Sequence, residues 1–463
     1  MTNLDTVIHG GRIATADAVV EADIGITGET IAAIGHDLHG ARIIDATGML
    51  ILPGGVDAHV HLSLAPGEET EGDGPHWVDD FASGSAAALA GGITTVGNMA
   101  FPAPGEGPRA TLAREGALVR AQAIADIFLH PVLGALTPET LDDIPRLQTI
   151  GCASVKIFLV AHDFDRQGTA VLEAVRRAGA SGLLTLLHCE DHAIIADATA
   201  RLLADGRGAP RHYGEACPVV SEVVATQRAV AIAEATGAPV YIVHLSSARA
   251  LAVCAEAQAR GLPVYVETRP LYLHLTQERL AEPDGPKYIG QPPLRTRADV
   301  DALWAGLRAG SIHTVCSDHA PWSLAAKLDP ALTVADPRPG VENLQTLRPM
   351  LYSEGVRTGR LSLERFVALT ATNAAKLMGL YPRKGTIAVG SDADLVIFDP
   401  AYTRTVDAAM LKSKADYSVY EGWEVTGWPT WTLSRGEVVF RDDAVCGQPG
   451  RGLLLDRGTT RPL

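Results

Sequence analysis

The stretch Val56-Asp-Ala-His-Val-His-Leu62 is the first of eight short apolar runs, and the longer segments between these runs have apolar residues at helical spacing. Such an alternation is typical of parallel strands that helices bury on both faces. Eight units of this kind predict an α/β protein with a TIM-type (β/α)8 barrel. The expected strands are residues 56–62, 93–97, 126–132, 154–159, 184–190, 240–245, 264–269 and 312–319.

The two ends of the chain have another pattern. Between residues 6 and 49, and again between residues 385 and 440, short apolar clusters alternate with glycine-containing turns. This spacing predicts short strands, and we expect both ends to form one small β-sandwich. The predicted domains are a sandwich of residues 1–55 and 376–441, a barrel of residues 56–375, and a C-terminal tail of residues 442–463 without assigned structure.

Composition excludes several classes of protein. The chain has 463 residues, of which 47% are hydrophobic and 20% charged, so it can bury a large core. With 54 acidic and 39 basic side chains, the net charge is −15, which repels nucleic acids and anionic membrane surfaces. Six scattered cysteines without a C-x-x-C pair, and an N-terminus without signal-peptide features, predict a cytoplasmic protein with no membrane segment.

Histidine and aspartate side chains recur where the expected strands end. His59 and His61 are two residues apart on one strand, so they point to the same side. His188, His244 and Asp318 lie near the ends of the fifth, sixth and eighth runs. A single histidine on a strand is more often a core residue, but five such groups at equivalent positions predict a metal site at the catalytic end of the barrel.

Lys156 lies among apolar neighbours at the end of the fourth run. An ammonium there would repel divalent cations, and its burial would be costly. Burial favours the free amine, which can react with carbon dioxide to give a carbamate whose two oxygens suit two metal ions. The alternatives are a lysine whose ammonium reaches solvent at the strand end or pairs with an acid.

These residues resemble the amidohydrolase superfamily over almost the entire chain. The resemblance rests on Gly54-Gly-Val-Asp-Ala-His-Val-His61, on Lys156 with the two later histidines, and on Ser317-Asp-His-Ala-Pro321. Within that superfamily, residues 77–84, 90–96 and 371–387 are similar to the dihydropyrimidinase and hydantoinase branch.

The resemblance implies a two-metal centre. One divalent ion would be held by His59, His61, carbamylated Lys156 and Asp318, and the other by Lys156, His188 and His244. Zinc is the first choice for this mixture of imidazole and carboxylate ligands, and manganese, cobalt or iron would suit the same set.

The implied reaction is hydrolysis of a ring amide. A hydroxide bridging the two metals would attack a cyclic ureide or imide, such as a 5-substituted hydantoin or a dihydropyrimidine, and yield an N-carbamoyl amino acid. Asp318 would take the proton and deliver it to the departing ring nitrogen. Two alternatives remain: an allantoinase, which would use the same ligands, and a non-catalytic scaffold related to dihydropyrimidinase, against which the complete ligand set argues.

Other positions bear on the substrate. Ser63 stands where dihydroorotases carry an arginine, which argues against that activity. Ala161 and His162 stand where dihydropyrimidinases have a tyrosine that assists the oxyanion, so His162 is the candidate donor. Segments near Gln291 and Asp336 would hold the ring through backbone groups. Relatives of this kind are often tetramers or dimers, and we expect a homo-oligomer.

Overall fold

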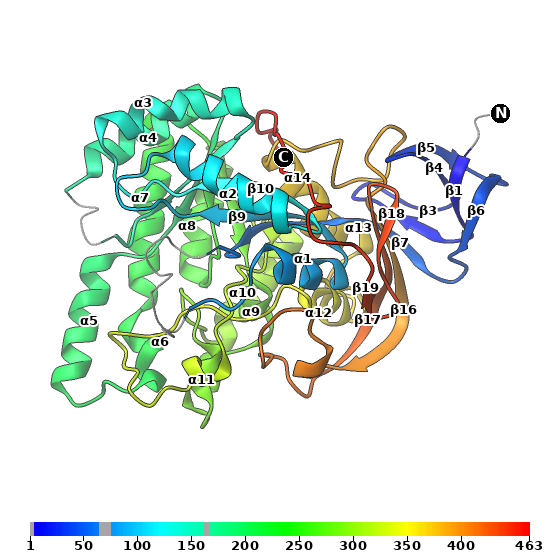
Figure 1. The fold of residues 1–463 in the computed structure, drawn as a ribbon. Coiled ribbons are helices and arrows are strands. Elements are labelled where there is room, and N and C mark those ends of the chain that lie inside the picture. The colour runs from blue at the N-terminus through cyan, green and yellow to red at the C-terminus, as the bar shows by residue number, and fades with distance from the viewer. Residues whose placement is uncertain (1–3, 64–75, 162–165) are drawn as a thin grey trace.

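The computed structural model describes residues 4–63, 76–161 and 166–463. Figure 1 displays a barrel with helices on its outer side and, beside it, a β-sandwich built from both ends of the chain. The predicted fold class is confirmed, whereas the exact domain boundaries stay a prediction.

Eight parallel strands form the barrel. Two sheets, β8–β9–β10 and β11–β15, are closed into one ring by the bridges Val132–Lys156 and Val60–His319. The last strands are shorter than predicted because the chain turns inward soon after them, with positive φ at His244 and Asp318. The strands are β8 (Gly55–Val60), β9 (Ile93–Ala100), β10 (Asp126–Pro131), β11 (Ser154–Phe158), β12 (Leu184–His188), β13 (Val240–Ile242), β14 (Val264–Thr268) and β15 (Thr314–Val315).

The segments between the strands contain the covering helices. Asp80 begins α1 with a capping box, and Gly237 ends α7 in the left-handed conformation that glycine tolerates. The helices are α1 (Phe81–Ala90), α2 (Pro108–Gln122), α3 (Pro138–Leu147), α4 (Gly168–Ala180), α5 (His192–Ala204), α6 (Tyr213–Ala216), α7 (Val219–Thr236), α8 (Ala248–Ala259), α9 (Pro270–His274), α10 (Arg297–Ala309), α11 (Leu324–Lys327), α12 (Leu347–Leu351), α13 (Leu363–Val367) and α14 (Asn373–Leu377).

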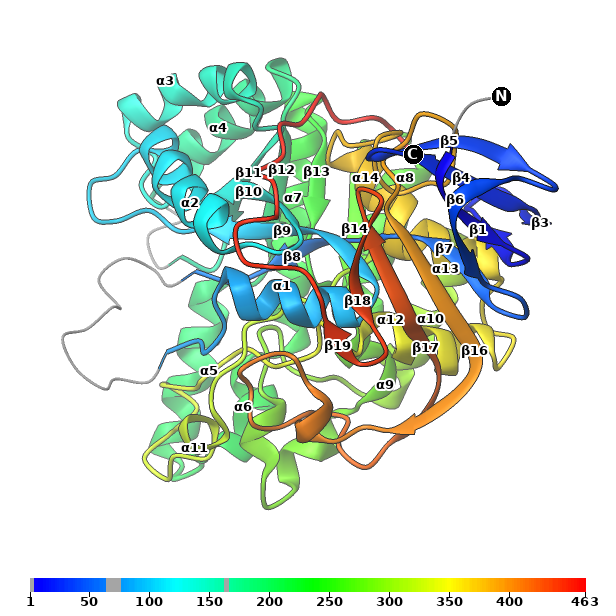
Figure 2. The same cartoon turned by 45° about the vertical axis from the view of Figure 1, so that its right-hand side comes forward.

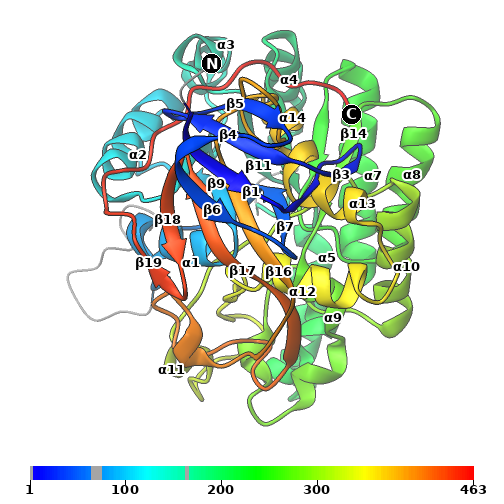
Figure 3. The same ribbon diagram turned by 90° about the vertical axis from the view of Figure 1, so that its right-hand side faces the viewer.

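The sandwich consists of two sheets, which face the viewer in Figure 3. One has the order β5-β4-β1-β6 and the other β19-β18-β17-β16-β7-β2-β3, so β16 from the end of the chain pairs with β7 from its beginning. Buried isoleucines pack between the sheets. The strands are β1 (Leu4–His9), β2 (Arg12–Ala14), β3 (Val19–Glu21), β4 (Asp23–Thr27), β5 (Thr30–Gly35), β6 (Gly40–Asp45), β7 (Leu50–Pro53), β16 (Leu395–Thr405), β17 (Glu424–Ser434), β18 (Glu437–Arg441) and β19 (Ala444–Val445).

The C-terminal tail packs on its own barrel. It runs along β10 (Figure 2), where Leu455 donates its backbone N–H to Ile127 and the Ile127 N–H donates to Leu453. Leu455 and Arg457 are buried. Within the described ranges, no single helix is both long and apolar enough to cross a membrane, and only the bent pair Pro210–Ala216 and Val219–Thr236 meets these criteria together.

Replacing Leu455 with alanine should destabilise the barrel. Leu455 is 5% exposed and Leu453 is 45% exposed, so only the first substitution opens a cavity. We expect Leu455→Ala to lower the free energy of unfolding by about 2–3 kcal/mol and the matched control Leu453→Ala by less than about 0.5 kcal/mol. Denaturant unfolding measures both. Equal effects of the two substitutions would contradict docking of the tail at Leu455.

Candidate active site

The six predicted ligand residues lie at the carboxyl ends of barrel strands. His59 is on β8 with His61 just after it, Lys156 is on β11, and His188 ends β12. His244 and Asp318 follow β13 and β15. A cavity of about 250 Å³ is lined by five of the six, namely His59, His61, His188, His244 and Asp318. Lys156 is completely buried.

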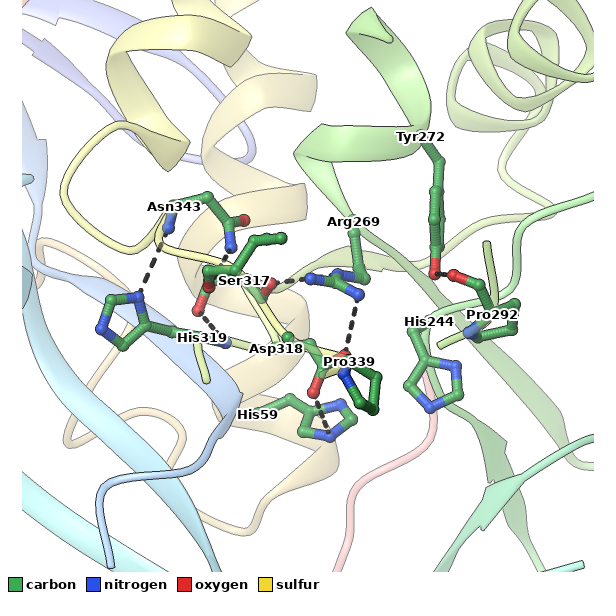
Figure 4. A network of polar contacts seen from close by, with 12 residues as sticks. His59, His244, Arg269, Tyr272, Pro292, Ser317, Asp318, His319, Pro339 and Asn343 are labelled. Carbon is green, nitrogen blue, oxygen red and sulfur yellow. Dashed lines mark hydrogen bonds and ion pairs between the residues drawn. The ribbon is translucent and has the colours of Figure 1, made fainter. Parts of the chain in front are cut away.

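Asp318 brings two of the imidazoles together. Its Oδ1 lies 3.1 Å from His59 Nε2 and 3.0 Å from His61 Nε2, and the ligand atoms of these three buried residues are all within 4.8 Å of one another. Figure 4 shows His59 and Asp318 in contact. Burial is the main cause that lowers the pKa of His61 to about 4, so this imidazole is neutral, as a metal ligand must be. The group can hold a metal ion.

Glu267 fixes the orientation of His59. Its Oε1 accepts from His59 Nδ1 at 2.8 Å and from the backbone N–H of His244 at 2.9 Å. Burial alone would raise the pKa of Glu267, but His59 and the hydrogen bonds lower it, so the side chain is a carboxylate that only accepts. His59 Nδ1 therefore donates to Glu267, and this contact turns Nε2 toward Asp318.

His188 and His244 form a second pair. His188 Nε2 donates to Glu190 at 3.0 Å, which leaves its Nδ1 facing His244 Nε2 at 2.9 Å. Burial lowers the pKa of both imidazoles. His188 Nδ1 and His244 Nε2, both on neutral rings, therefore face each other. This pair lies next to the group of His59, His61 and Asp318, because the ring centroids of His59 and His244 are 5.5 Å apart.

Lys156 is close enough to both histidine pairs, His59 with His61 and His188 with His244, for its charge to affect them. Its positive charge lowers the pKa values of His61, His188 and His244. Its Nζ is buried and has no hydrogen-bond partner among the described residues, and burial lowers the pKa of this amine to about 8. An orphaned amine beside neutral imidazoles and a carboxylate fits a centre in which the lysine becomes an anionic metal ligand.

Arg269 contacts the other side of Asp318. Its Nη1 lies 3.0 Å from Asp318 Oδ2 and its Nε donates to the Ser317 carbonyl at 3.2 Å (Figure 4). Although burial opposes the charged form, His59 and Arg269 hold the pKa of Asp318 well below its usual range. Asp318 is thus an anion whose Oδ2 is oriented by Arg269 and whose Oδ1 faces the imidazoles.

The walls of the cavity are mainly apolar. Trp77, Phe101 and Phe158 follow one another with ring-centroid distances of 6.0 and 6.1 Å, and Trp77 lies 4.8 Å from His61. Gln291 supplies a polar group to the lining. Among the described residues that line the cavity, Asp318 is the only acidic one, and none is a lysine or an arginine.

The predicted substrate contacts have different outcomes. Gln291 lines the cavity. Asp336 does not reach it: a turn between Thr333 and Asp336 leaves Asp336 exposed, and Pro339 and Gly340 line the cavity instead. His162 lies outside the described residues.

Sequence reasoning missed the residues that hold the ligands in place. Glu267 is the penultimate residue of β14 and Glu190 follows β12, so both are near the strand ends where the histidines were found. That position is the signal that could have identified them. Nothing in the local sequence distinguishes Trp77 or Phe101 from core aromatics.

Comparison with known proteins agrees with this geometry. Residues 48–250 match a family model described as dihydro-orotase-like, and residues 309–440 match one described as the amidohydrolase family. The chain is 36% identical over 461 residues to the D-hydantoinase of Geobacillus stearothermophilus, covering 97% of this chain and 96% of that one. It is 37% identical over 460 residues to the D-phenylhydantoinase of Escherichia coli O1:K1, covering 97% and 98%.

A solved structure agrees over the same length. The crystal structure of dihydropyrimidinase from Brevibacillus agri NCHU1002 superimposes with a TM-score of 0.92 and 34% identity, covering 98% of this chain and 99% of that one. With matches of this identity and coverage, and with a buried histidine and aspartate group at the expected strand ends, the chain belongs to the amidohydrolase family as a cyclic amidohydrolase of the hydantoinase and dihydropyrimidinase type.

Proposed function

We propose that the enzyme opens the ring amide of a 5-substituted hydantoin or a dihydropyrimidine and releases an N-carbamoyl amino acid. The observation that carries this proposal is the convergence of four imidazoles, Asp318 and the unpaired amine of Lys156 beside a small cavity with apolar walls. The names of the similar hydantoinases and dihydropyrimidinase support the same substrate class.

The proposed cofactors are two divalent ions, with zinc as the first choice, and carbon dioxide for carbamylation of Lys156. One ion would be held by His59, His61, Lys156 and Asp318, and the other by Lys156, His188 and His244. When bound, such ions lower the pKa of water towards neutrality and polarise a carbonyl.

Asp318 is the proposed proton carrier. It is a carboxylate at neutral pH and lines the cavity, so it can accept a proton from the attacking water and pass it to the leaving ring nitrogen. Arg269 holds Oδ2 and so keeps the carboxylate from rotating during these transfers.

The cavity walls favour a neutral, apolar ring substituent. Stacked against Trp77, Phe101 and Phe158, an aromatic or aliphatic group at ring position 5 would be removed from water. The carboxylate of dihydroorotate would meet no lysine or arginine among the described lining residues, and Ser63 accepts a hydrogen bond from Asn98 at 3.0 Å. Allantoin, with its polar ureido group, is the second candidate.

The proposal extends to assembly and location. We propose a homo-oligomer, a tetramer or a dimer, in the cytoplasm. All six cysteines are free thiols, as a reducing compartment favours.

Parallel assays of four cyclic compounds should identify which ring the enzyme opens. Protein supplied with zinc and bicarbonate is given dihydrouracil, 5-phenylhydantoin, allantoin and dihydroorotate, and the opened products are measured. We expect 5-phenylhydantoin or dihydrouracil to be preferred. As the control, Asp318→Asn should lose about 10³-fold in kcat. Preference for allantoin would favour the second candidate, and a wild-type protein that binds no metal would favour a scaffold.

Carbamylation of Lys156 should depend on pH. The pKa of Lys156 is about 8, below the ordinary 10.5, so the reactive free amine increases as pH rises. At equal dissolved carbon dioxide, metal-stripped protein should recover bound zinc about tenfold faster at pH 9 than at pH 7. Lys156→Ala should not recover it unless a short carboxylic acid is added. The same recovery rate at both pH values would contradict the carbamate.

Glu267→Gln should weaken metal binding. A glutamine amide can donate to His59 Nδ1 and so move the ring proton to Nε2, where it blocks the lone pair. We expect about 10- to 100-fold weaker zinc binding in competition with a chelator. The control is Glu342→Gln, because burial raises the pKa of Glu342 to about 8 and this side chain is already neutral at pH 7. Equal zinc affinity in both variants would contradict the role of Glu267.

A further inference from the structure

The side chain of Lys327, the last residue of α11, is completely buried. Its Nζ donates to three backbone carbonyls, those of Ile289 at 2.7 Å, Arg338 at 2.6 Å and Gly340 at 3.0 Å. Neither the metal-ligand group nor its hydrogen-bond partners include this lysine, so the chemistry described above leaves it without a role.

The three carbonyls belong to two separate segments that reach the cavity. Residues 289–291 supply Gln291, and residues 338–340 supply Pro339 and Gly340. The backbone N–H of Gly340 also donates to the Ile289 carbonyl at 3.0 Å. Lys327 Nζ therefore binds two segments that line the cavity from different parts of the chain and that share one direct backbone hydrogen bond.

The charge of Lys327 suits this position. No described carboxylate lies within 4.0 Å of its Nζ, although a buried ammonium normally has one. Burial and then the positive charge of Arg269 lower the pKa of Lys327 well below its usual range, and the three carbonyls oppose that shift because each can accept one of the three N–H groups of the ammonium. Removing the amine would leave two segments with buried carbonyls that lack this donor.

The second segment has little room to adapt. Gly340 has a φ of +117°, and a Cβ at this position would lie 2.4 Å from the Ala320 carbonyl oxygen. Trp322 Nε1 donates to the Pro339 carbonyl at 2.8 Å. The place of Pro339 and Gly340 in the cavity wall thus depends on a few contacts, of which the Lys327 amine and the hydrogen bond from Gly340 to Ile289 reach the other segment.

We propose that Lys327 is a positioning residue for substrate recognition. It holds segments 289–291 and 338–340 at the separation at which both contact the bound ring. The inference rests on the proposed function, since it assumes that the cavity binds a cyclic ureide. Loss of the amine should weaken substrate binding more than it slows the chemical step, because no metal ligand contacts Lys327.

Arg348 provides a matched control for a purely structural role. It is equally buried and also donates to backbone carbonyls, those of Gly92 and Pro53. These two residues lie just before β9 and β8, at the opposite end of the barrel strands from the cavity. Arg348→Met and Lys327→Met therefore remove comparable buried donors, one far from the cavity and one beside it.

The experiment compares zinc-loaded wild-type protein with Lys327→Met, Lys327→Gln and Arg348→Met. Bound zinc, Tm, and kcat and KM for 5-phenylhydantoin and dihydrouracil are measured. Hydrogen–deuterium exchange of peptides that contain residues 289–291 and 338–342 is followed in the same samples. The Gln variant keeps an N–H donor without the charge, and it decides the question if the Met variant does not fold.

We expect Lys327→Met to raise KM about tenfold or more, to change kcat less than about threefold, and to keep the bound zinc. Lys327→Gln should lie between this variant and wild type. Both peptides should exchange faster than in wild type. Arg348→Met should lower Tm with KM and both peptides unchanged. A Lys327→Met protein that only loses Tm, with KM within twofold of wild type, would overturn the proposal.

The two proposals can fail separately. If wild-type protein opens neither ring, the proposed substrate class is wrong, and the exchange of the two peptides alone decides the role of Lys327. Faster exchange of both peptides in Lys327→Met, and of neither in Arg348→Met, still assigns Lys327 as the residue that joins the two segments. Unchanged exchange refutes it.

Discussion

The burial of the Asp318 carboxylate is the constraint on which the active site depends. A carboxylate removed from water is stable only when charges or hydrogen-bond donors compensate it. His59 and His61 lie 3.1 and 3.0 Å from its Oδ1, and Arg269 lies 3.0 Å from its Oδ2. These groups come from β8 and from the residues that follow β8 and β14, so the barrel must close between its first and last strands before Asp318 can be buried.

The backbone of two of the candidate ligand residues, Asp318 and His244, is strained. Asp318 and His244 have φ values of 49° and 38°, which cost a non-glycine residue about 1–2 kcal/mol each. Hydrogen bonds hold these conformations: the Asp318 N–H donates to the His59 carbonyl at 2.8 Å, and the His244 N–H donates to Glu267 at 2.9 Å. The turns end β13 and β15 early and direct both side chains into the cavity.

The sequence predicted the features that depend on local pattern. Short apolar runs identified every barrel strand, and the position at a strand end identified His188 and Lys156 as candidate ligands. Features that depend on packing between distant segments could not be predicted. Asp336 was expected near the substrate, but a turn exposes it, and no pattern in a four-residue helix marks Lys327 as the partner of three distant carbonyls.

The buried lysines distinguish a reactive amine from structural ones. Lys384 Nζ lies within 2.9 Å of the carboxylates of Asp126, Asp392 and Asp394, so it is a compensated cation. Lys327 gives its three N–H groups to carbonyls. Of the three lysines with completely buried side chains among the described residues, only Lys156 has an Nζ without a hydrogen-bond partner. Burial without compensation favours the neutral amine, and a neutral amine is nucleophilic. The proposed carbamylation would turn this uncompensated group into an anion beside the imidazoles, where the proposed metal ions would balance its charge.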